Sequence, residues 1–185
     1  LLQLILIRML LLQLATMNQE KIKQKLLMQK NQKLRWLNNG TAPFLSKEIQ
    51  SHDVFDFMLN DLKRADTIVI SSFAITEAYI RRLIKNSNRI GFVTLFLDVT
   101  IGTRNPRLTA YASMNVNELF LLDNHSKTIY MSGSGKELLA VMSNNATNNH
   151  RYESGIVFSD PEIIRQFVQQ YETMKAESCD YDNPG

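Results

Sequence analysis

The chain between residues 44 and 178 alternates between short apolar runs and segments with helical periodicity. The two strongest runs, Thr67–Phe73 (TIVISSF) and Ile90–Val99 (IGFVTLFLDV), are β-branched or aromatic and short enough for buried strands. Further strands are expected at 117–122, 128–131, 138–142 and 155–158, and helices at 52–64, 76–85, 104–114 and 161–175. Because helices separate the early strands and short turns separate the later ones, we expect an α/β fold, with a mixed sheet flanked by helices.

The chain divides into three segments. Residues 1–43 are interpreted as an N-terminal helical arm, apolar and then basic; residues 44–178 as the α/β domain; and residues 179–185 as a C-terminal tail. Apolar residues at helical spacing predict a helix over 18–37, which Asn38-Asn39-Gly40 would end, and Pro43 marks a linker.

The first 16 residues leave several interpretations open. The apolar stretch is about 15 residues long and contains Arg8, whereas a spanning helix needs roughly 20 apolar residues. One interpretation is that translation begins at Met17 and that residues 1–16 are not native. Another is an amphipathic helix that packs on a partner. A membrane anchor is the least favoured.

Charge and cysteine content exclude several classes of function. Residues 1–43 hold seven basic residues against one acidic residue, whereas the remainder holds 14 against 17, so the main body is not generally basic. Cys179 is the single cysteine, which excludes an intramolecular disulfide and a cysteine-based zinc site. It suits a reducing compartment, and we expect a cytoplasmic protein. Three histidines are too few for a His-rich metal centre, and no cofactor is expected.

Polar residues cluster around three of the later predicted strands. His125 and Lys127 are two residues apart, as are Ser143 and Asn145 after the next strand, and Glu153 precedes a third strand. In an extended strand, residues with this spacing point to the same face. If the three strands are neighbours, these five side chains converge at one end of the sheet.

This set of side chains suits phosphoryl transfer. An imidazole can attack phosphorus or protonate a leaving oxygen, while an ammonium and an amide stabilise charge on the non-bridging oxygens. A carboxylate can orient the imidazole and favour one tautomer. No metal is needed if these groups supply the positive charge and the nucleophile. Taken one at a time, each residue is more typical of a solvated strand end or a turn than of a catalytic site.

The ordered combination of H-S-K at 125–127, S-N-N at 143–145 and R-Y-E at 151–153 resembles the phospholipase D-like superfamily. The signature of that family is H-x-K with a later Asp, followed by Gly-Ser-x-Asn, and the resemblance covers roughly residues 45–175. Two positions depart from the signature: Ser132 stands in place of the Asp, and Met142 in place of the Gly. Lys136 nearby is a poor substitute for an acid.

The resemblance implies a mechanism and an assembly. One histidine attacks phosphorus to give a phosphohistidine, a second histidine protonates the leaving group, and water resolves the intermediate. Because this chain has a single H-x-K, the implied enzyme is a homodimer in which His125 of each subunit contributes. Lys127 and Asn145 would bind phosphate oxygens, Ser143 would support the phosphate or the histidine, and Glu153 would orient an imidazole. Single-motif members are typically bacterial nucleases.

Three functions remain open from the sequence. The first is a metal-independent phosphodiesterase that acts on nucleic acid, with Arg104, Arg107 and Arg151 as backbone contacts, although a solvated loop explains these arginines as well. The second is a catalytically degenerate module that binds nucleic acid or a partner protein, which Ser132 and the acidic main body favour. The third is a lipid-directed phosphohydrolase. Its support is confined to residues 1–43, so a membrane partner is not favoured.

Overall fold

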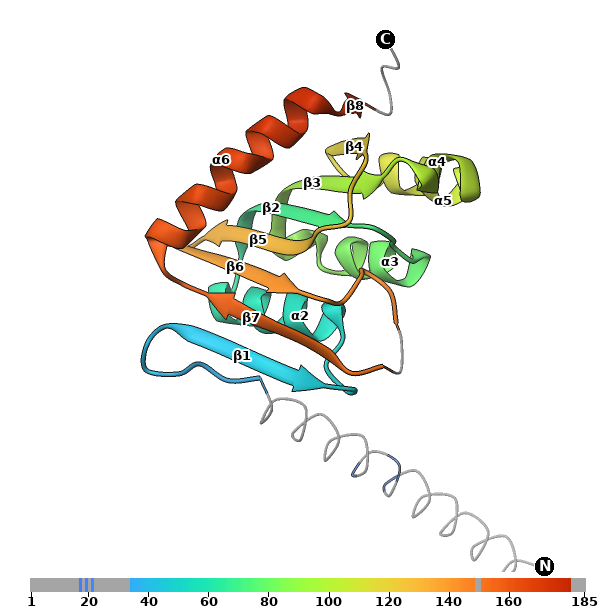
Figure 1. Ribbon diagram of the computed structural model, residues 1–185. Helices are drawn as coiled ribbons and strands as arrows, with labels where there is room; N and C mark the ends of the chain where they lie inside the picture. The colour runs from blue at the N-terminus through green and yellow to red at the C-terminus, as the bar shows by residue number, and fades with distance from the viewer. Residues whose placement is uncertain (1–16, 18, 20, 22–33, 149–150, 181–185) are drawn as a thin grey trace, which may run out of the picture.

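The strands form one mixed sheet in the computed structural model, which describes residues 17, 19, 21, 34–148 and 151–180 (Figure 1). The strands are β1 (Thr41–Ser46), β2 (Ala65–Ser72), β3 (Ile90–Asp98), β4 (Glu118–Leu122), β5 (Lys127–Gly133), β6 (Lys136–Met142), β7 (Glu153–Phe158) and β8 (Cys179–Asp180). Their order across the sheet is β1-β7-β6-β5-β2-β3-β4-β8. Strand β3 is parallel to β2 and β4, whereas the other pairs are antiparallel. The predicted mixed sheet is confirmed.

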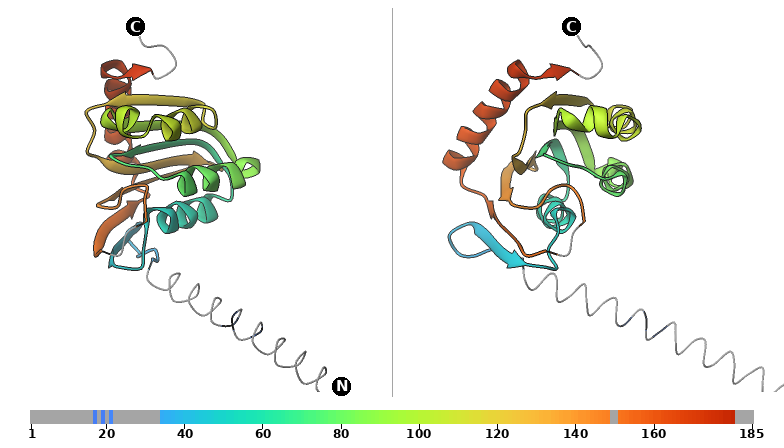
Figure 2. Two further views of the ribbon diagram at one scale, coloured as in Figure 1. Left: turned by 90° about the vertical axis from the view of Figure 1, so that its right-hand side faces the viewer. Right: turned by 45° about the vertical axis from the view of Figure 1, so that its right-hand side comes forward.

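Helices cover both faces of this sheet. They are α2 (Ser51–Leu62), α3 (Glu77–Lys85), α4 (Thr100–Arg104), α5 (Pro106–Ser113) and α6 (Pro161–Glu177), with a 3₁₀ turn η1 at Ser87–Arg89. Helices α2 to α5 lie on one face and α6 crosses the other, as the views in Figure 2 show. The predicted α/β layering is therefore present.

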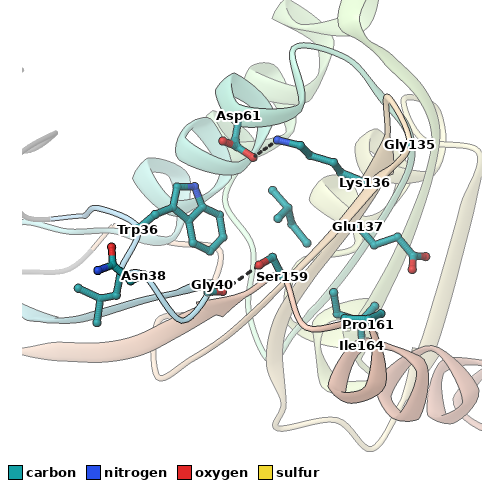
Figure 3. A pocket seen from close by; sticks show the side chains of 12 residues that line it. Trp36, Asn38, Gly40, Asp61, Gly135, Lys136, Glu137, Ser159, Pro161 and Ile164 are labelled. Carbon is teal, nitrogen blue, oxygen red and sulfur yellow. Dashed lines mark hydrogen bonds and ion pairs between the residues drawn. The ribbon is translucent and has the colours of Figure 1, made fainter.

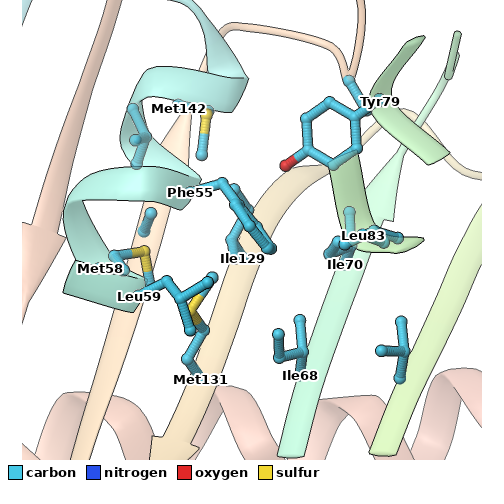
Figure 4. Packing of buried hydrophobic residues seen from close by; sticks show 14 of the residues in the cluster. Phe55, Met58, Leu59, Ile68, Ile70, Tyr79, Leu83, Ile129, Met131 and Met142 are labelled. Atoms are coloured by element: carbon cyan, nitrogen blue, oxygen red, sulfur yellow. The ribbon is translucent and has the colours of Figure 1, made fainter. Parts of the chain in front are cut away.

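The middle of each central strand is a continuous apolar run because both of its faces are buried there. In β2, Ile68 and Ile70 pack under α2 and α3, whereas Val69 belongs to the smaller cluster under α6. Phe55 and Met58 of α2 fill the larger cluster (Figure 4). Strands buried on both faces lose the usual alternation of apolar and polar residues. This explains the unbroken apolar run Ile68–Ile70 within TIVISSF.

One predicted helix is wrong in its extent. The sequence predicts a single helix over 104–114, but the chain forms α4 and α5 with Asn105 between them. The Asn105 side chain accepts a hydrogen bond from the Leu108 amide (3.2 Å), and Pro106 occupies the first turn of α5. Asparagine is a preferred N-cap and proline suits the first helical position, so this pair starts a new helix.

Strand β1 was not expected, and the interpretation of Pro43 as a linker is wrong. Pro43 lies within β1, opposite Ile156 of β7. Strand β1 is an edge strand with β7 as its one neighbour among the described strands, so Pro43, which has no N–H, removes no hydrogen bond to a strand on its other side. Strand β1 crosses the boundary that the sequence placed at residue 43. Leu34 is also buried in the core, so the domain begins before this boundary.

The two ends of the chain differ partly from the sequence prediction. Residues 34–37 are not helical, because the Leu37 amide bonds to the Thr41 carbonyl (2.7 Å) in a turn. The rest of the predicted helix over 18–37 falls mostly outside the described residues, as do residues 1–16. Within the described ranges, no helix has both the length and the apolar character needed to cross a bilayer. Cys179 and Asp180 pair with β4, while 181–185 lie outside the description.

Candidate active site

The ends of three neighbouring strands lie together at one end of the sheet. Lys127 begins β5, Met142 ends β6 and Glu153 begins β7. The antiparallel registers place Val141 opposite Thr128, and Gly155 opposite Met142. The residues that flank these strands therefore lie together at the same end of the sheet, as predicted from the sequence for neighbouring strands.

Four of the predicted side chains form two hydrogen-bonded pairs there. Lys127 Nζ lies 3.1 Å from His125 Nδ1 and also donates to the His125 carbonyl oxygen. Ser143 Oγ donates to the Glu153 carboxylate and accepts from the Ser154 amide (3.0 Å). Burial lowers the pKa of Lys127, while the charge of Glu153 opposes that shift. His125 is exposed, so its ring is open to a substrate.

Asn145 is held close to this cluster by its neighbour. The Ala146 amide donates to Ser72 Oγ (2.9 Å), and the Thr76 amide donates to the Ala146 carbonyl (3.0 Å). Ser72 in turn pairs with Lys127 across β2 and β5. Asn145 Oδ1 is buried and finds no hydrogen-bond partner within the described part of the chain. Asn144 Oδ1 is in the same state, so the unpaired oxygen does not distinguish Asn145; the group of Asn145 that can donate to a phosphate oxygen is its NH₂.

A buried network that the sequence analysis missed fixes the loop that carries His125. The Asn124 side chain donates to Ser71 Oγ (2.9 Å) and to the Phe96 carbonyl (3.0 Å). Its Oδ1 accepts from the Ser126 amide (2.9 Å) and hydroxyl (2.7 Å). Asn124 is 4% exposed, so its bonds to Ser71 and Phe96 form away from solvent, whereas those to the exposed Ser126 are partly buried. They hold the residues on both sides of His125 in place.

Asp98 ties this network to α4. Its carboxylate accepts from the Asn124 amide (3.3 Å) and the Thr100 amide (3.0 Å), and it also accepts from the Thr100 hydroxyl. Burial opposes its ionisation, but these hydrogen bonds and Arg104 nearby together hold the pKa of Asp98 below its ordinary value. The sequence offered one signal: Asp98 ends the apolar strand β3, and Asn124 follows the apolar strand β4 by two residues. Polar residues at such places are also common in turns.

The predicted arginines occupy different places. Arg104 reaches the site, because its guanidinium lies 5.1 Å from the centre of the Phe73 ring, and that ring lies 5.2 Å from the ring of His125. Arg107 lines a separate pocket between α3 and α5. Arg151 is exposed, two residues before Glu153. The sequence analysis did not single out Phe73, although it is the residue that connects Arg104 with His125.

Comparison with solved structures decides the fold. NucT from Helicobacter pylori superposes with a TM-score of 0.62 at 19% identity, over 76% of this chain and 98% of its own. Nuc from Salmonella typhimurium, described as a phospholipase D family member, gives 0.60 at 18% identity, over 76% and 97%. The chain has the phospholipase D-like fold. TrmBL2, an archaeal chromatin protein with a novel mode of DNA binding, gives 0.55 at 13% identity, over 89% and 64%. No protein-family model matches the sequence, and no curated protein matches it.

The first departure from the phospholipase D-like signature lies far from the site. Ser132 is near the other end of β5, opposite Glu137. It lies five positions further along the strand than Lys127, a distance of about 16 Å. Lys136 lies at that same far end and pairs with Asp61 at 3.7 Å, so it does not replace the missing acid. The change to serine therefore removes no group from the cluster around His125.

The second departure is accommodated across the sheet. Met142 packs into the core opposite Gly155, where a Cβ atom would lie 2.7 Å from Met142 Cβ and 2.7 Å from Phe44 Cε1. The glycine that the signature places before Ser143 is thus replaced by a large residue facing a glycine on β7.

We therefore expect Gly155→Ala to lower the free energy of unfolding by about 1–3 kcal/mol, because the added methyl group overpacks this contact. Chemical denaturation of the two proteins measures the difference. The cost should be smaller in a Met142→Gly background, where one of the two clashing side chains is gone. An alanine variant as stable as the parent would contradict this account of the departure.

One cavity lies away from the site. It has a volume of about 540 Å³ and is bordered by Trp36, by the β5–β6 hairpin and by the start of α6 (Figure 3). Large pockets are the default place to look for an active site. Here the cavity contains the Asp61–Lys136 pair from the far end of the strands, and no predicted catalytic residue lines it. Within the described ranges, no group of three or more His, Cys, Asp or Glu side chains could hold a metal ion.

Proposed function

We propose that the chain is a metal-independent phosphodiesterase that cleaves nucleic acid as a homodimer through a phosphohistidine. The observation that carries this proposal is the cluster at the strand ends, where Lys127 contacts His125 and Glu153 contacts Ser143. An exposed imidazole next to a fixed ammonium is the combination that attack on an anionic phosphodiester needs. The fold it shares with Nuc and NucT supports the same class of chemistry.

In the proposed reaction, an unprotonated nitrogen of His125 attacks phosphorus. A nitrogen–phosphorus bond forms, and the bond to the leaving oxygen breaks. Lys127 and Asn145 bind the non-bridging oxygens as their negative charge increases, which is the role of an oxyanion site. Lys127 now contacts the ring nitrogen Nδ1, so it has to turn from the ring to the phosphate when substrate binds.

The second half of the reaction requires another imidazole. The chain has one H-x-K, so we assign the proton of the leaving oxygen to His125 of a second copy, across a two-fold axis. That histidine then removes a proton from the water that attacks phosphorus, and the nitrogen–phosphorus bond breaks. Glu153 keeps an imidazole in the required tautomer, and Ser143 holds the Glu153 carboxylate in place.

The test is cleavage of single-stranded DNA, duplex DNA, RNA and bis(4-nitrophenyl) phosphate in excess EDTA. We expect turnover that EDTA does not reduce, because Lys127 and Asn145 supply the charge stabilisation that a metal would otherwise give. Activity that disappears in EDTA and returns with a divalent cation would contradict the proposal.

The alternative is a degenerate module that binds nucleic acid without cleaving it. Its support is the fold shared with TrmBL2, which is described as binding DNA, since Ser132 lies too far from the cluster to argue for it. It predicts that the folded protein binds oligonucleotides, turns over none of the four substrates, and binds equally well after His125→Ala.

A further inference from the structure

Basic side chains gather on the surface of α3 and α5, which lie side by side on one face of the sheet (Figure 2). Residues 44–185 contain 14 basic and 17 acidic residues. We define the basic track as the six basic residues of this surface: Arg81, Arg82, Lys85, Arg89, Arg104 and Arg107. A main body with a net negative charge thus concentrates positive charge on one of its surfaces.

The basic track begins at the candidate active site. Arg104 contacts Phe73, which contacts His125. The separate pocket of about 300 Å³ between α3 and α5 begins at Asn105, the residue after Arg104, and is also bordered by Thr76 and Arg107. The Thr76 amide is bonded to the carbonyl of Ala146, the residue that follows Asn145. The pocket therefore opens beside the groups assigned to the phosphate.

The track continues along α3 without a gap. Tyr111 borders the same pocket, and the guanidinium of Arg81 lies 5.8 Å from the centre of its ring. Arg81 also borders the next pocket, of about 400 Å³, together with Lys85 and Arg89. Arg89 is fixed at the end of α2, where it donates to the Leu59 and Lys63 carbonyls (2.8 Å each). Contacts thus connect the site with the far end of α3.

Arg82 of the track pairs with Asp56, and Arg104 lies 3.8 Å from Asp98, whereas the charges of Arg81 and Lys85 are available to an anion. Arg81 pairs with Glu77 at 2.6 Å, but the two side chains are 67% and 56% exposed. Exposed pairs contribute about 0–1 kcal/mol, so a phosphate can replace the carboxylate at little cost. Lys85 is exposed, and among the described residues no hydrogen bond or ion pair is found for it.

We propose that the basic track binds the phosphate backbone of a nucleic-acid strand that leads away from the active site along α5 and α3. The inference rests on the proposed function and names the path of its substrate. A row of arginine and lysine side chains that begins at a phosphodiester-cleaving centre matches the repeating charge of a nucleic-acid backbone. The same backbone is present in single strands and duplexes, so the experiment uses both.

The test is the double variant Arg81→Gln/Lys85→Gln, with Arg165→Gln/Lys136→Gln as the matched control. The control also removes one arginine and one lysine, but from α6 on the other face and from the far hairpin. Fluorescence anisotropy in EDTA measures binding of a labelled single strand and a labelled duplex of about 20 nucleotides or base pairs, in the His125→Gln background to prevent cleavage. Thermal unfolding confirms that each variant is folded.

We expect the track variant to bind roughly tenfold more weakly and the control to bind like the parent. The slope of log affinity against log salt should fall by about 0.7 per lost contact with a single strand, or about 0.9 with a duplex. The nucleic acid, single strand or duplex, that loses more affinity is the one that follows the track. Equal effects of the two double variants, or no binding by the parent, would overturn the inference. Binding through the track without cleavage by wild type would overturn the proposed function alone.

Discussion

We expect His125→Ala to lower kcat on the order of 10⁴-fold or more, because the variant lacks both the nucleophile and the general acid of the proposed reaction. His125 is exposed, and the buried bonds beneath it are made by Asn124, so the variant should keep its fold. Steady-state cleavage of bis(4-nitrophenyl) phosphate in EDTA measures the loss. The wild-type reaction is stopped with a denaturant in place of acid. Mass spectrometry of this sample should detect a covalent phosphoryl adduct that is absent from the variant.

A conservative substitution and a mixing experiment sharpen this prediction. His125→Gln retains a hydrogen-bonding side chain but cannot form a phosphohistidine, so it should be as inactive as alanine. Wild type and His125→Gln are mixed in equal amounts and allowed to exchange subunits. If each centre needs one histidine from each subunit, the mixture should have about a quarter of the activity of wild type at the same total concentration, whereas independent subunits would give about half. Substantial turnover by either variant would show that His125 is not the nucleophile.

The sequence predicts most of the fold because the signals that define it are local. The apolar runs of β2 and β3 and the proline-initiated α6 are recognisable within a few residues. Strand β1 was missed because its sequence, TAPFLS, contains a proline, and only its position at the edge of the sheet makes that proline acceptable. That position depends on the pairing of β1 with β7, which is more than 100 residues away along the chain.

The candidate site shows the same division. Residues on β5 and around the ends of β6 and β7 could be placed together from their spacing, since strand periodicity sets which face they share. The network of Asp98, Asn124 and Ser71 could not, because it joins the ends of β2, β3 and β4. A polar residue after an apolar strand has the same appearance in a sequence whether it becomes a surface turn or a buried anchor. Burial, which decides between the two, is a property of the assembled sheet.

We expect Lys127→Ala to lower kcat about 10²–10³-fold, the usual cost of removing one group that stabilises a transition-state oxyanion. The ammonium is poised for this role, since it lies 3.1 Å from the attacking imidazole and is held on the strand paired with Ser72. Lys136→Ala is the matched control, because it removes the same side chain from the far end of the adjacent strand. The control should retain the activity of wild type.

The pH dependence tests the charge of Lys127 directly. Burial lowers its pKa, so the ammonium loses its proton at a lower pH than an ordinary lysine does. Deprotonation of Lys127 should make the activity fall as the pH rises through this lowered pKa. Lys127→Arg stays charged throughout this range, so its profile should lack this fall. Identical alkaline profiles for wild type and Lys127→Arg would show that the reaction does not depend on the protonation of Lys127.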